Sequence, residues 1–328
     1  MTKRKLLLFL PAILVLVYVA GPKPEKPDFH QVLPDLPEVP AEVEDWLQQR
    51  EAALPVKADN QAHIVWARDS LPQKTEYVVL YLHGFGASRR EGAPAHLHLA
   101  RQLQANLLLG RLEGHGLRDT LPLQNFNAQN YYDSALEHYA LAKKLGRKVV
   151  IMGSSTGGTL ALLLAAGFPE VEALVLLSPN IRIKDPMATL LNKPWGYQLG
   201  RLATGSEVMS SQHPADWYPL YWYPRYSLRA VVEMQQLLAT GMRPKVFARV
   251  QQPLLLLYYY RNEVEQDPVV RVDAMLRMFR QVGTPAKHKW ALALPEAGDH
   301  VVGCDLRSGA LPQVEEALNN FSLELKDL

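Results

Sequence analysis

The feature that most constrains this chain is a regular alternation of short apolar runs with segments of helical periodicity, from about residue 62 almost to the end. We predict strands in the apolar runs 62–67, 77–82, 107–112, 148–152, 173–177, 253–260 and 289–294. Helical spacing occupies segments near 95–104, 132–139, 157–166, 272–281 and 313–321. Strands that alternate with helices predict βαβ units, and therefore an α/β fold with a mainly parallel sheet and helices on both faces.

Three of the predicted strands end in glycine-rich sequences. These are HGFG at 83–86, GHG at 114–116 and GSSTGG at 153–158. In parallel sheets of this kind, ligands bind beyond the carboxyl ends of the strands. We therefore expect the functional site where these three loops meet.

The sequence GSSTG at 153–157 matches the pattern G-x-S-x-G, and it lies between a predicted strand and a predicted helix. This context is that of a nucleophile elbow, in which the central serine takes a strained backbone conformation and small neighbours permit the tight turn. Ser155 is then the candidate nucleophile, whereas Ser154 should point elsewhere. The alternative is an ordinary glycine turn, because roughly one chain of this length in ten matches the pattern by chance.

A serine nucleophile needs a base, which in this arrangement is a histidine late in the chain, with an acid before it. His300 fits the base, because it follows the last predicted strand in the sequence PEAGDH at 295–300. Asp267 fits the acid, because it follows strand 253–260 and precedes Pro268, Val269 and Val270. Glu263, which is closer to the strand end, remains the alternative acid.

Acyl transfer also needs hydrogen-bond donors for the oxyanion. One candidate is the backbone N–H of Thr156, directly after the proposed nucleophile. The other is the backbone N–H of Phe85 in the HGFG loop. For the HGFG sequence taken alone, a glycine turn is the alternative interpretation.

Composition excludes several function classes. The chain has 328 residues, 48% of them hydrophobic, and a formal net charge of only +2, so we expect no nucleic-acid partner. Its single cysteine, Cys304, permits no internal disulfide. No CxxC or HExxH spacing indicates a metal site, and we expect neither a metal nor an organic cofactor.

The N-terminal 21 residues predict a signal peptide or membrane anchor. Lys3, Arg4 and Lys5 precede an apolar run over 6–20, which is shorter than the about 20 residues of a usual membrane-spanning helix. The end of the run lacks an A-x-A cleavage pattern. We expect export, with the body on the periplasmic side of the inner membrane if anchored, or free in the periplasm if cleaved. The alternative is a core helix.

Residues 22–60 form a proline-rich segment, which we interpret as a semi-stiff spacer interrupted by a short helix at about 41–53. The remaining residues, 61–328, form the predicted catalytic domain.

Taken together, these motifs resemble those of the α/β-hydrolase superfamily, and most closely its serine aminopeptidase and monoacylglycerol lipase (lysophospholipase-like) group. The resemblance covers about 77–321. It rests on the sequences LHGFGAS at 82–88, RLEGHG at 111–116, GSSTGG at 153–158, QDPVV at 266–270 and GDHVV at 298–302. It implies the α/β-hydrolase fold and a triad of Ser155, His300 and Asp267.

The βα rhythm stops at about 181–227, and this segment resembles the cap inserted in members of the family. It is rich in aromatic residues, namely Trp195, Tyr197, Trp217, Tyr218, Tyr221, Trp222, Tyr223 and Tyr226. These side chains either pack the segment onto the core or line an acyl or alcohol pocket.

The sequence therefore predicts a serine hydrolase that cleaves carboxylic esters through an acyl-enzyme. The expected partners are a small-molecule ester or lipid-like substrate and, through the N-terminal segment, a membrane. The alternatives are a thioesterase or acyltransferase, and a non-catalytic binding protein with the same fold.

Overall fold

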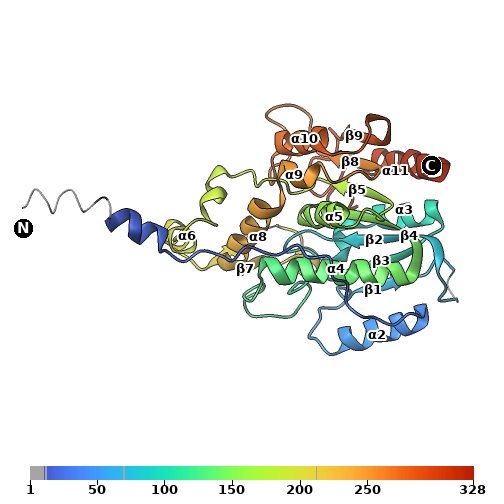
Figure 1. The fold of residues 1–328 in the computed structure, drawn as a ribbon, viewed down its shortest axis with the longest axis horizontal. Coiled ribbons are helices and arrows are strands. Elements are labelled where there is room, and N and C mark those ends of the chain that lie inside the picture. Colours follow the sequence, from blue (N-terminus) through green and yellow to red (C-terminus); the bar gives the residue numbers. More distant parts are fainter. Residues whose placement is uncertain (1–10, 12, 69–70, 212) are drawn as a thin grey trace, which may run out of the picture.

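The structure is a computed structural model, and it describes residues 11, 13–68, 71–211 and 213–328. Its centre is a seven-stranded sheet in the order β1-β3-β2-β4-β5-β8-β9 (Figure 1). Only β1 is antiparallel to its neighbour. This confirms the predicted α/β class with a mainly parallel sheet. The strands are β1 (His63–Val65), β2 (Thr75–Leu82), β3 (Asn106–Leu109), β4 (Gly146–Ser154), β5 (Ala173–Leu177), β8 (Leu254–Tyr258) and β9 (Lys289–Ala293).

Helices cover both faces of the sheet (Figure 1). One face packs against α4 (Ala128–Leu145), α5 (Thr156–Gly167) and α10 (Val272–Gln281), and the other against α3 (Ala95–Leu103) and α11 (Leu311–Asp327). Along β2, Val78 and Leu80 face the first group while Val79 and Tyr81 face the second. Because both faces are buried, the strands are apolar throughout and do not alternate with polar residues.

The centre of the sheet supports the turn between β4 and α5. Helix α5 is hydrophobic all round, as expected of a helix enclosed on every side, and it is buried over residues 156–166. Its first residue directly follows Ser155. The elements around this turn are therefore among the most enclosed in the molecule.

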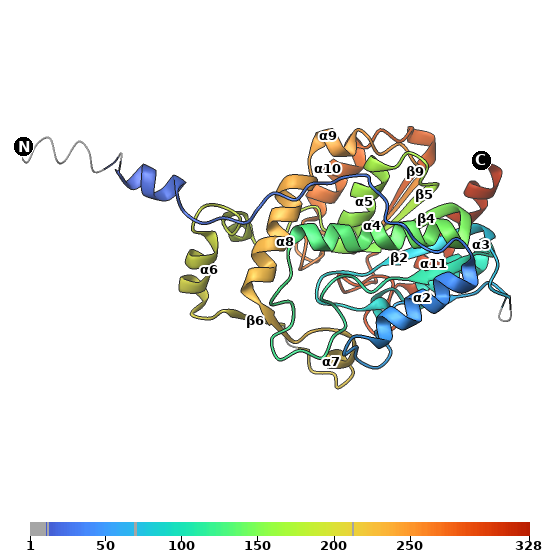
Figure 2. The same ribbon diagram turned by 60° about the horizontal axis from the view of Figure 1, so that its bottom comes forward.

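Short elements fill the region between β5 and β8, in place of a single crossover helix. Figures 1 and 2 show α6 and α8 at the end of the molecule opposite the C-terminus of α11. The predicted loss of βα rhythm at 181–227 is thus observed, and the role of the segment as a cap stays a prediction. The elements are η2 (Pro186–Leu190), α6 (Gly196–Thr204), β6 (Val208–Ser210), α7 (Tyr218–Tyr221), β7 (Arg225–Ser227), α8 (Leu228–Gly241) and α9 (Pro244–Phe247). Strands β6 and β7 pair antiparallel, and a short η3 (Ala286–His288) precedes β9.

The proline-rich segment packs against the body of the protein, whereas a flexible spacer would make no such contacts. Over 22–39 it has no regular secondary structure, yet it packs along α4. The Phe29 ring meets the Tyr132 ring edge-on at 5.1 Å, and the Tyr132 hydroxyl donates to the His30 carbonyl at 2.7 Å. The predicted short helix follows as α2 (Pro40–Ala52), which buries Val43 and Leu47.

Most of the predicted signal or anchor segment, residues 1–10 and 12, lies outside the described residues. Residues 13–19 are helical and project from the body, with apolar side chains that are about half exposed or more (Figures 1 and 2). Its end contacts Trp195, whose indole Nε1 donates to the Val17 carbonyl at 3.0 Å. In the part of the chain that the structure describes, no helix is both long enough and apolar enough to cross a membrane.

Candidate active site

The turn between β4 and α5 has a strained backbone at Ser155. Its φ of 50° and ψ of −118° lie outside the regions that serine ordinarily adopts. Two glycines make the turn possible: a Cβ at Gly153 would lie 2.5 Å from the Gly157 carbonyl oxygen, and one at Gly157 only 2.0 Å from the Leu82 carbonyl oxygen. The strained conformation expected for a nucleophile elbow is therefore present.

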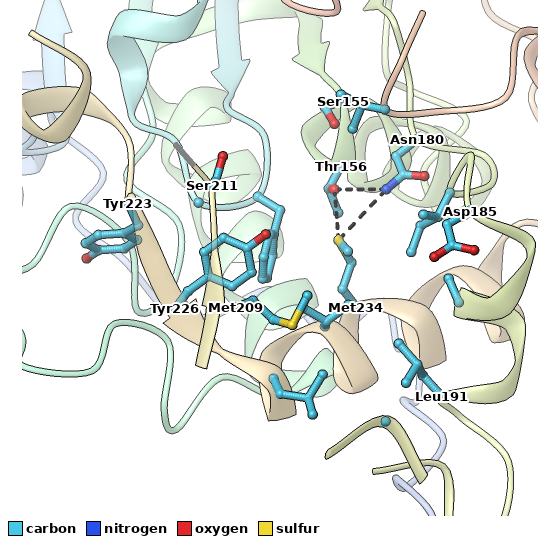
Figure 3. Close-up of a pocket in the computed structure, with 18 of the residues that line it drawn as sticks. Ser155, Thr156, Asn180, Asp185, Leu191, Met209, Ser211, Tyr223, Tyr226 and Met234 are labelled. Carbon is cyan, nitrogen blue, oxygen red and sulfur yellow. Dashed lines mark hydrogen bonds between the residues drawn. The ribbon is translucent and has the colours of Figure 1, made fainter. Parts of the chain in front are cut away.

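The two adjacent serines point to different places. Ser155 is 8% exposed and lines a pocket at the carboxyl end of the sheet (Figure 3). Ser154 instead accepts a hydrogen bond from the Tyr81 hydroxyl at 2.9 Å. Only Ser155 is available to a ligand in the pocket.

His300 and Asp267 meet beside this pocket. His300 Nδ1 lies 2.6 Å from Asp267 Oδ2, and the His300 ring lines the pocket together with Ser155. Within the described residues, Ser155 Oγ forms no hydrogen bond, a common situation in structures without substrate, where such contacts are long. The structure thus brings Ser155, His300 and Asp267 to one place.

The Asp267 carboxylate is held from two sides. Its other oxygen, Oδ1, accepts backbone N–H groups from Val269 at 2.8 Å and Val270 at 2.9 Å. Val270 is fully buried and fixes this loop to the core. Glu263, the alternative acid, lies on the exposed part of the loop and accepts a hydrogen bond from the Tyr260 hydroxyl.

The charges of this pair are coupled. Burial raises the pKa of the Asp267 carboxyl, but the His300 charge and the hydrogen bonds outweigh burial, so the pKa falls below its usual value. Burial lowers the pKa of His300, yet Asp267, with smaller contributions from Glu91 and Asp299, raises that pKa above its usual value. The contact therefore favours the carboxylate of Asp267 and stabilises the imidazolium of His300 when it forms.

Two backbone N–H groups lie near Ser155 at the pocket. Phe85 and Thr156 both line the pocket, and among the described residues neither backbone N–H donates a hydrogen bond. Thr156 is the first residue of α5, where the N–H groups have no partner within the helix. The two residues that the sequence suggested as oxyanion donors thus lie together at the pocket.

Two buried histidines shape the loop that carries Phe85. His115 Nε2 accepts the Gly86 N–H at 2.9 Å, and His83 Nε2 accepts the Leu112 N–H at 3.1 Å. Burial lowers the pKa of both rings, to about 4 for His115, so both stay neutral at pH 7. The sequence pointed to the GHG and HGFG motifs but not to this use of them.

The pocket has a cavity volume of about 530 Å³ and a mainly apolar wall (Figure 3). Ser155 and Thr156 lie at one end, and the wall is built largely from the region between β5 and β8. Apolar residues from this region include Leu191, Leu199, Met209, Leu228, Val231 and Met234. A cavity of this size and lining accommodates an apolar chain.

The aromatic residues of the 181–227 segment divide between the two predicted uses. Four of them line the pocket, namely Tyr218, Trp222, Tyr223 and Tyr226. The other four lie elsewhere, and Trp217, for example, packs edge-on against Trp222 at 5.8 Å. Both predicted uses, packing and pocket lining, therefore occur.

Two residues that the sequence did not single out complete the site. Asn180 Nδ2 lies 3.5 Å from Thr156 Oγ1, and both groups contact the Met234 sulfur (Figure 3). The second residue is Glu91, a buried carboxylate that lines the pocket. Nothing in the local sequence around either residue distinguishes it from a structural side chain.

Across the described ranges, no group of three or more histidine, cysteine, aspartate or glutamate side chains is arranged to hold a metal ion.

Comparisons with solved structures show the same fold. One of the metagenome-derived lipolytic enzymes LipS and LipT is 18% identical, with a TM-score of 0.66, over 82% of this chain and 99% of its own. A monoacylglycerol lipase from Paleococcus ferrophilus is 16% identical, with a TM-score of 0.55, over 81% and 99%. The esterase Est1E from Butyrivibrio proteoclasticus, with ferulic acid bound, is 16% identical, with a TM-score of 0.54, over 82% and 96%.

The sequence comparison is more specific than these structural likenesses. No curated protein sequence matches the chain significantly. The profile of the alpha/beta hydrolase family, however, matches residues 79–303, which include the HGFG loop, Ser155, Asp267 and His300. This protein therefore belongs to the alpha/beta hydrolase family.

Proposed function

We propose that this protein is a serine hydrolase that cleaves carboxylic esters through an acyl-enzyme. The observation that carries the proposal is Ser155 itself, held in a strained turn at an apolar pocket that it shares with His300. The Asp267 contact to His300 supports the same chemistry, and so do the N–H groups of Phe85 and Thr156, which donate to no group in the described part of the chain.

Each residue has a defined role in the proposed reaction. Ser155 Oγ attacks the acyl carbon while His300 Nε2 takes its proton, and Asp267 holds the ring and stabilises the imidazolium. The Phe85 and Thr156 N–H groups donate to the oxyanion of the tetrahedral intermediate. His300 then protonates the departing alcohol, and water, activated by the same ring, releases the acid and restores Ser155.

The electrostatics of His300 fix the expected pH dependence. The ring must be neutral to act as a base, and its pKa is raised above the usual value. Activity should therefore fall below a pH that lies above the ordinary histidine pKa of about 6.5. Above that pH, kcat/KM should reach a plateau.

The pocket favours esters with an apolar acyl or alcohol group over small polar ones. Its lining is mainly aliphatic and aromatic, and its volume is that of a ligand site. A panel of p-nitrophenyl esters of graded chain length, together with monoacylglycerols, measures this preference directly.

Labelling by a fluorophosphonate probe tests the proposal as a whole. The probe should attach to one residue, and mass spectrometry of the digested protein should find it on Ser155. The Ser155→Ala variant, checked for an unchanged melting temperature, should not react. A protein that hydrolyses no ester and resists the probe would be a binding protein instead.

We also propose that the N-terminal segment directs export and keeps the body at the periplasmic face of a membrane. The positively charged start, the apolar run and the exposed apolar helix at 13–19 support this. Residues 1–60 fused to a reporter that is active only outside the cytoplasm should give activity. A silent fusion, with a cytoplasmic reporter that works, would contradict the proposal.

A further inference from the structure

Glu91 is a buried carboxylate for which the reaction described so far has no role. It lies in the short helix η1 (Arg89–Gly92), is only 3% exposed and lines the same pocket as Ser155 and His300. Among the described residues no lysine or arginine forms an ion pair with Glu91, since Arg90 pairs with Asp305 and the nearby Arg307, whose charge lowers the pKa of Glu91, pairs with Asp299. Burying a carboxylate without a cationic partner is costly, so its position calls for an explanation.

The carboxylate holds the loop that follows β2. The Gly84 N–H donates to Glu91 Oε2 at 2.5 Å. The next peptide carries the Phe85 N–H, and the Gly86 N–H is held by His115. Contacts on both sides therefore fix the Phe85 N–H, one from a carboxylate and one from a neutral imidazole.

Gly84 lies between the Glu91 carboxylate and Ser155, close to both. A Cβ at Gly84 would lie 2.8 Å from Glu91 Oε1 and 3.0 Å from the Cβ of Ser155. Only a glycine lets the loop fit between the two side chains. Glu91 is thus one residue removed from direct contact with Ser155.

The negative charge of Glu91 also acts on His300. It is among the charges that raise the pKa of the ring, after Asp267. Burial in turn raises the pKa of Glu91 to about 6, although the Gly84 N–H and His300 oppose this. The negative charge of Glu91 and the positive charge of His300 therefore favour each other.

Resting on the proposed hydrolase function, we propose that Glu91 is a positioning residue with two effects. Its carboxylate holds the His83–Gly84 peptide and so positions the next peptide, whose Phe85 N–H donates to the developing oxyanion. Its charge stabilises the imidazolium that His300 forms when Ser155 attacks. Asp267 orients the ring through a direct contact, whereas Glu91 acts through the loop and at a distance.

Other charged or titratable groups face this pair from several elements, and each stays unchanged in the test below. They are Tyr81 on β2, Tyr131 on α4, Asp267 in the loop after β8, and Asp299, Cys304 and Arg307 in the chain after β9.

Two variants separate the hydrogen bond from the charge. Glu91→Gln keeps an acceptor for the Gly84 N–H and removes the charge. On p-nitrophenyl butyrate its plateau kcat/KM should stay within about tenfold of the parent, because a neutral acceptor is roughly half as strong as a charged one. In a plot of kcat/KM against pH, the fall on the acid side (the acid limb) should move to lower pH in this variant. Removing a negative charge lowers the pKa of the His300 imidazolium.

Glu91→Ala removes the acceptor as well. The Phe85 N–H is then no longer held in place, and kcat should fall about 100-fold, as small misplacements of catalytic groups do, with KM nearly unchanged. Should this variant fold poorly, the rate of fluorophosphonate labelling of Glu91→Gln against pH reports the same His300 ionisation without turnover. The pH dependence of this labelling is by itself enough to show whether the charge of Glu91 acts on His300.

A matched control is Glu51→Gln. Glu51 is also buried, at 9% exposure, and it holds Arg111 with hydrogen bonds of 2.7 and 2.9 Å. It is not among the charges that act on His300. This variant should lower the melting temperature and leave the acid limb in place.

The proposal is overturned if Glu91→Gln keeps the acid limb of the parent, or if folded Glu91→Ala keeps its kcat. These results are distinct from failure of the hydrolase function itself. That failure would show as a parent protein that hydrolyses no ester and resists the probe, or as full activity in Ser155→Ala, whatever the Glu91 variants do.

Discussion

The loops at the carboxyl edge of the sheet and the region between β5 and β8 build opposite walls of one pocket in different ways. The loops carry buried polar groups, a strained backbone at Ser155 and glycines with no room for a side chain. The region between β5 and β8 combines helices with the short β6–β7 pair and has exposed apolar side chains, such as Leu199 at 53% and Leu202 at 81%. We infer that the loops determine the reaction and the other wall selects the substrate.

The strongest test of this division is the pair of adjacent serines. Ser155→Ala should lower kcat about 10⁶-fold, as loss of a triad serine does. Ser154→Ala should keep substantial activity, but it leaves the Tyr81 hydroxyl without its partner and should lower stability by about 1–3 kcal/mol. Ester hydrolysis and thermal melting of both variants measure this. Loss of activity in Ser154→Ala with retention in Ser155→Ala would reverse the assignment.

The acid gives the next largest effect. Asp267→Asn should lower kcat by up to about 10⁴-fold, because His300 loses the group that fixes its tautomer. Glu263→Gln, on the exposed part of the same loop, should lose less than about tenfold, since Glu263 lies on the surface and contacts Tyr260. Steady-state kinetics on variants with equal melting temperatures give the comparison. If Glu263→Gln loses most of its activity and Asp267→Asn does not, Glu263 is the acid of the triad.

The apolar wall should respond in selectivity and not in chemistry. Val231 on α8 lines the pocket, and Val231→Trp should shorten the space for an acyl chain. We expect kcat/KM on p-nitrophenyl dodecanoate to fall about 10- to 100-fold, with little change on the acetate. Leu323→Trp, on α11 at 59% exposure, is the control. Equal losses on both esters would show that this wall also positions the reacting groups.

The smallest expected effect is on the free energy of unfolding, through Glu91 in the loops at the carboxyl edge of the sheet. The pKa of Glu91 is raised from 4.5 to about 6 in the fold, so its contribution to stability is present below pH 4.5 and is lost as the pH rises through about 6. Glu91→Gln should therefore be more stable than the parent at pH 8, by up to about 2 kcal/mol. The gain should vanish near pH 4. Urea unfolding at both pH values checks this, and an equal gain at both would exclude the ionisation as its cause.

The order of strands and helices could be predicted from the sequence because periodicity and glycine breaks report it directly. The predicted strand 173–177 and helix 272–281 agree with β5 and α10. The strained turn at Ser155 was also predictable, since the spacing of small residues permits few other conformations.

Contacts that depend on how loops and short elements fold could not be predicted in the same way. Glu91 looks like any surface glutamate beside two arginines, and only the folded loop shows its carboxylate next to Gly84. The split among the aromatic residues at 181–227 likewise depends on how short helices pack, which periodicity does not report. The packing of residues 22–39 onto α4 is a third example, because proline content indicates stiffness and not contact.

That packing limits how far the helical residues 13–19 can move relative to the body. A free chain of this length could reach up to about 60 Å and let the body swing in every direction. Here Phe29 and His30 contact α4, and Gly21 lies against Trp195 just ahead of α6. These contacts hold residues 21–30 against the body, so the helical residues 13–19 leave the body at one defined place.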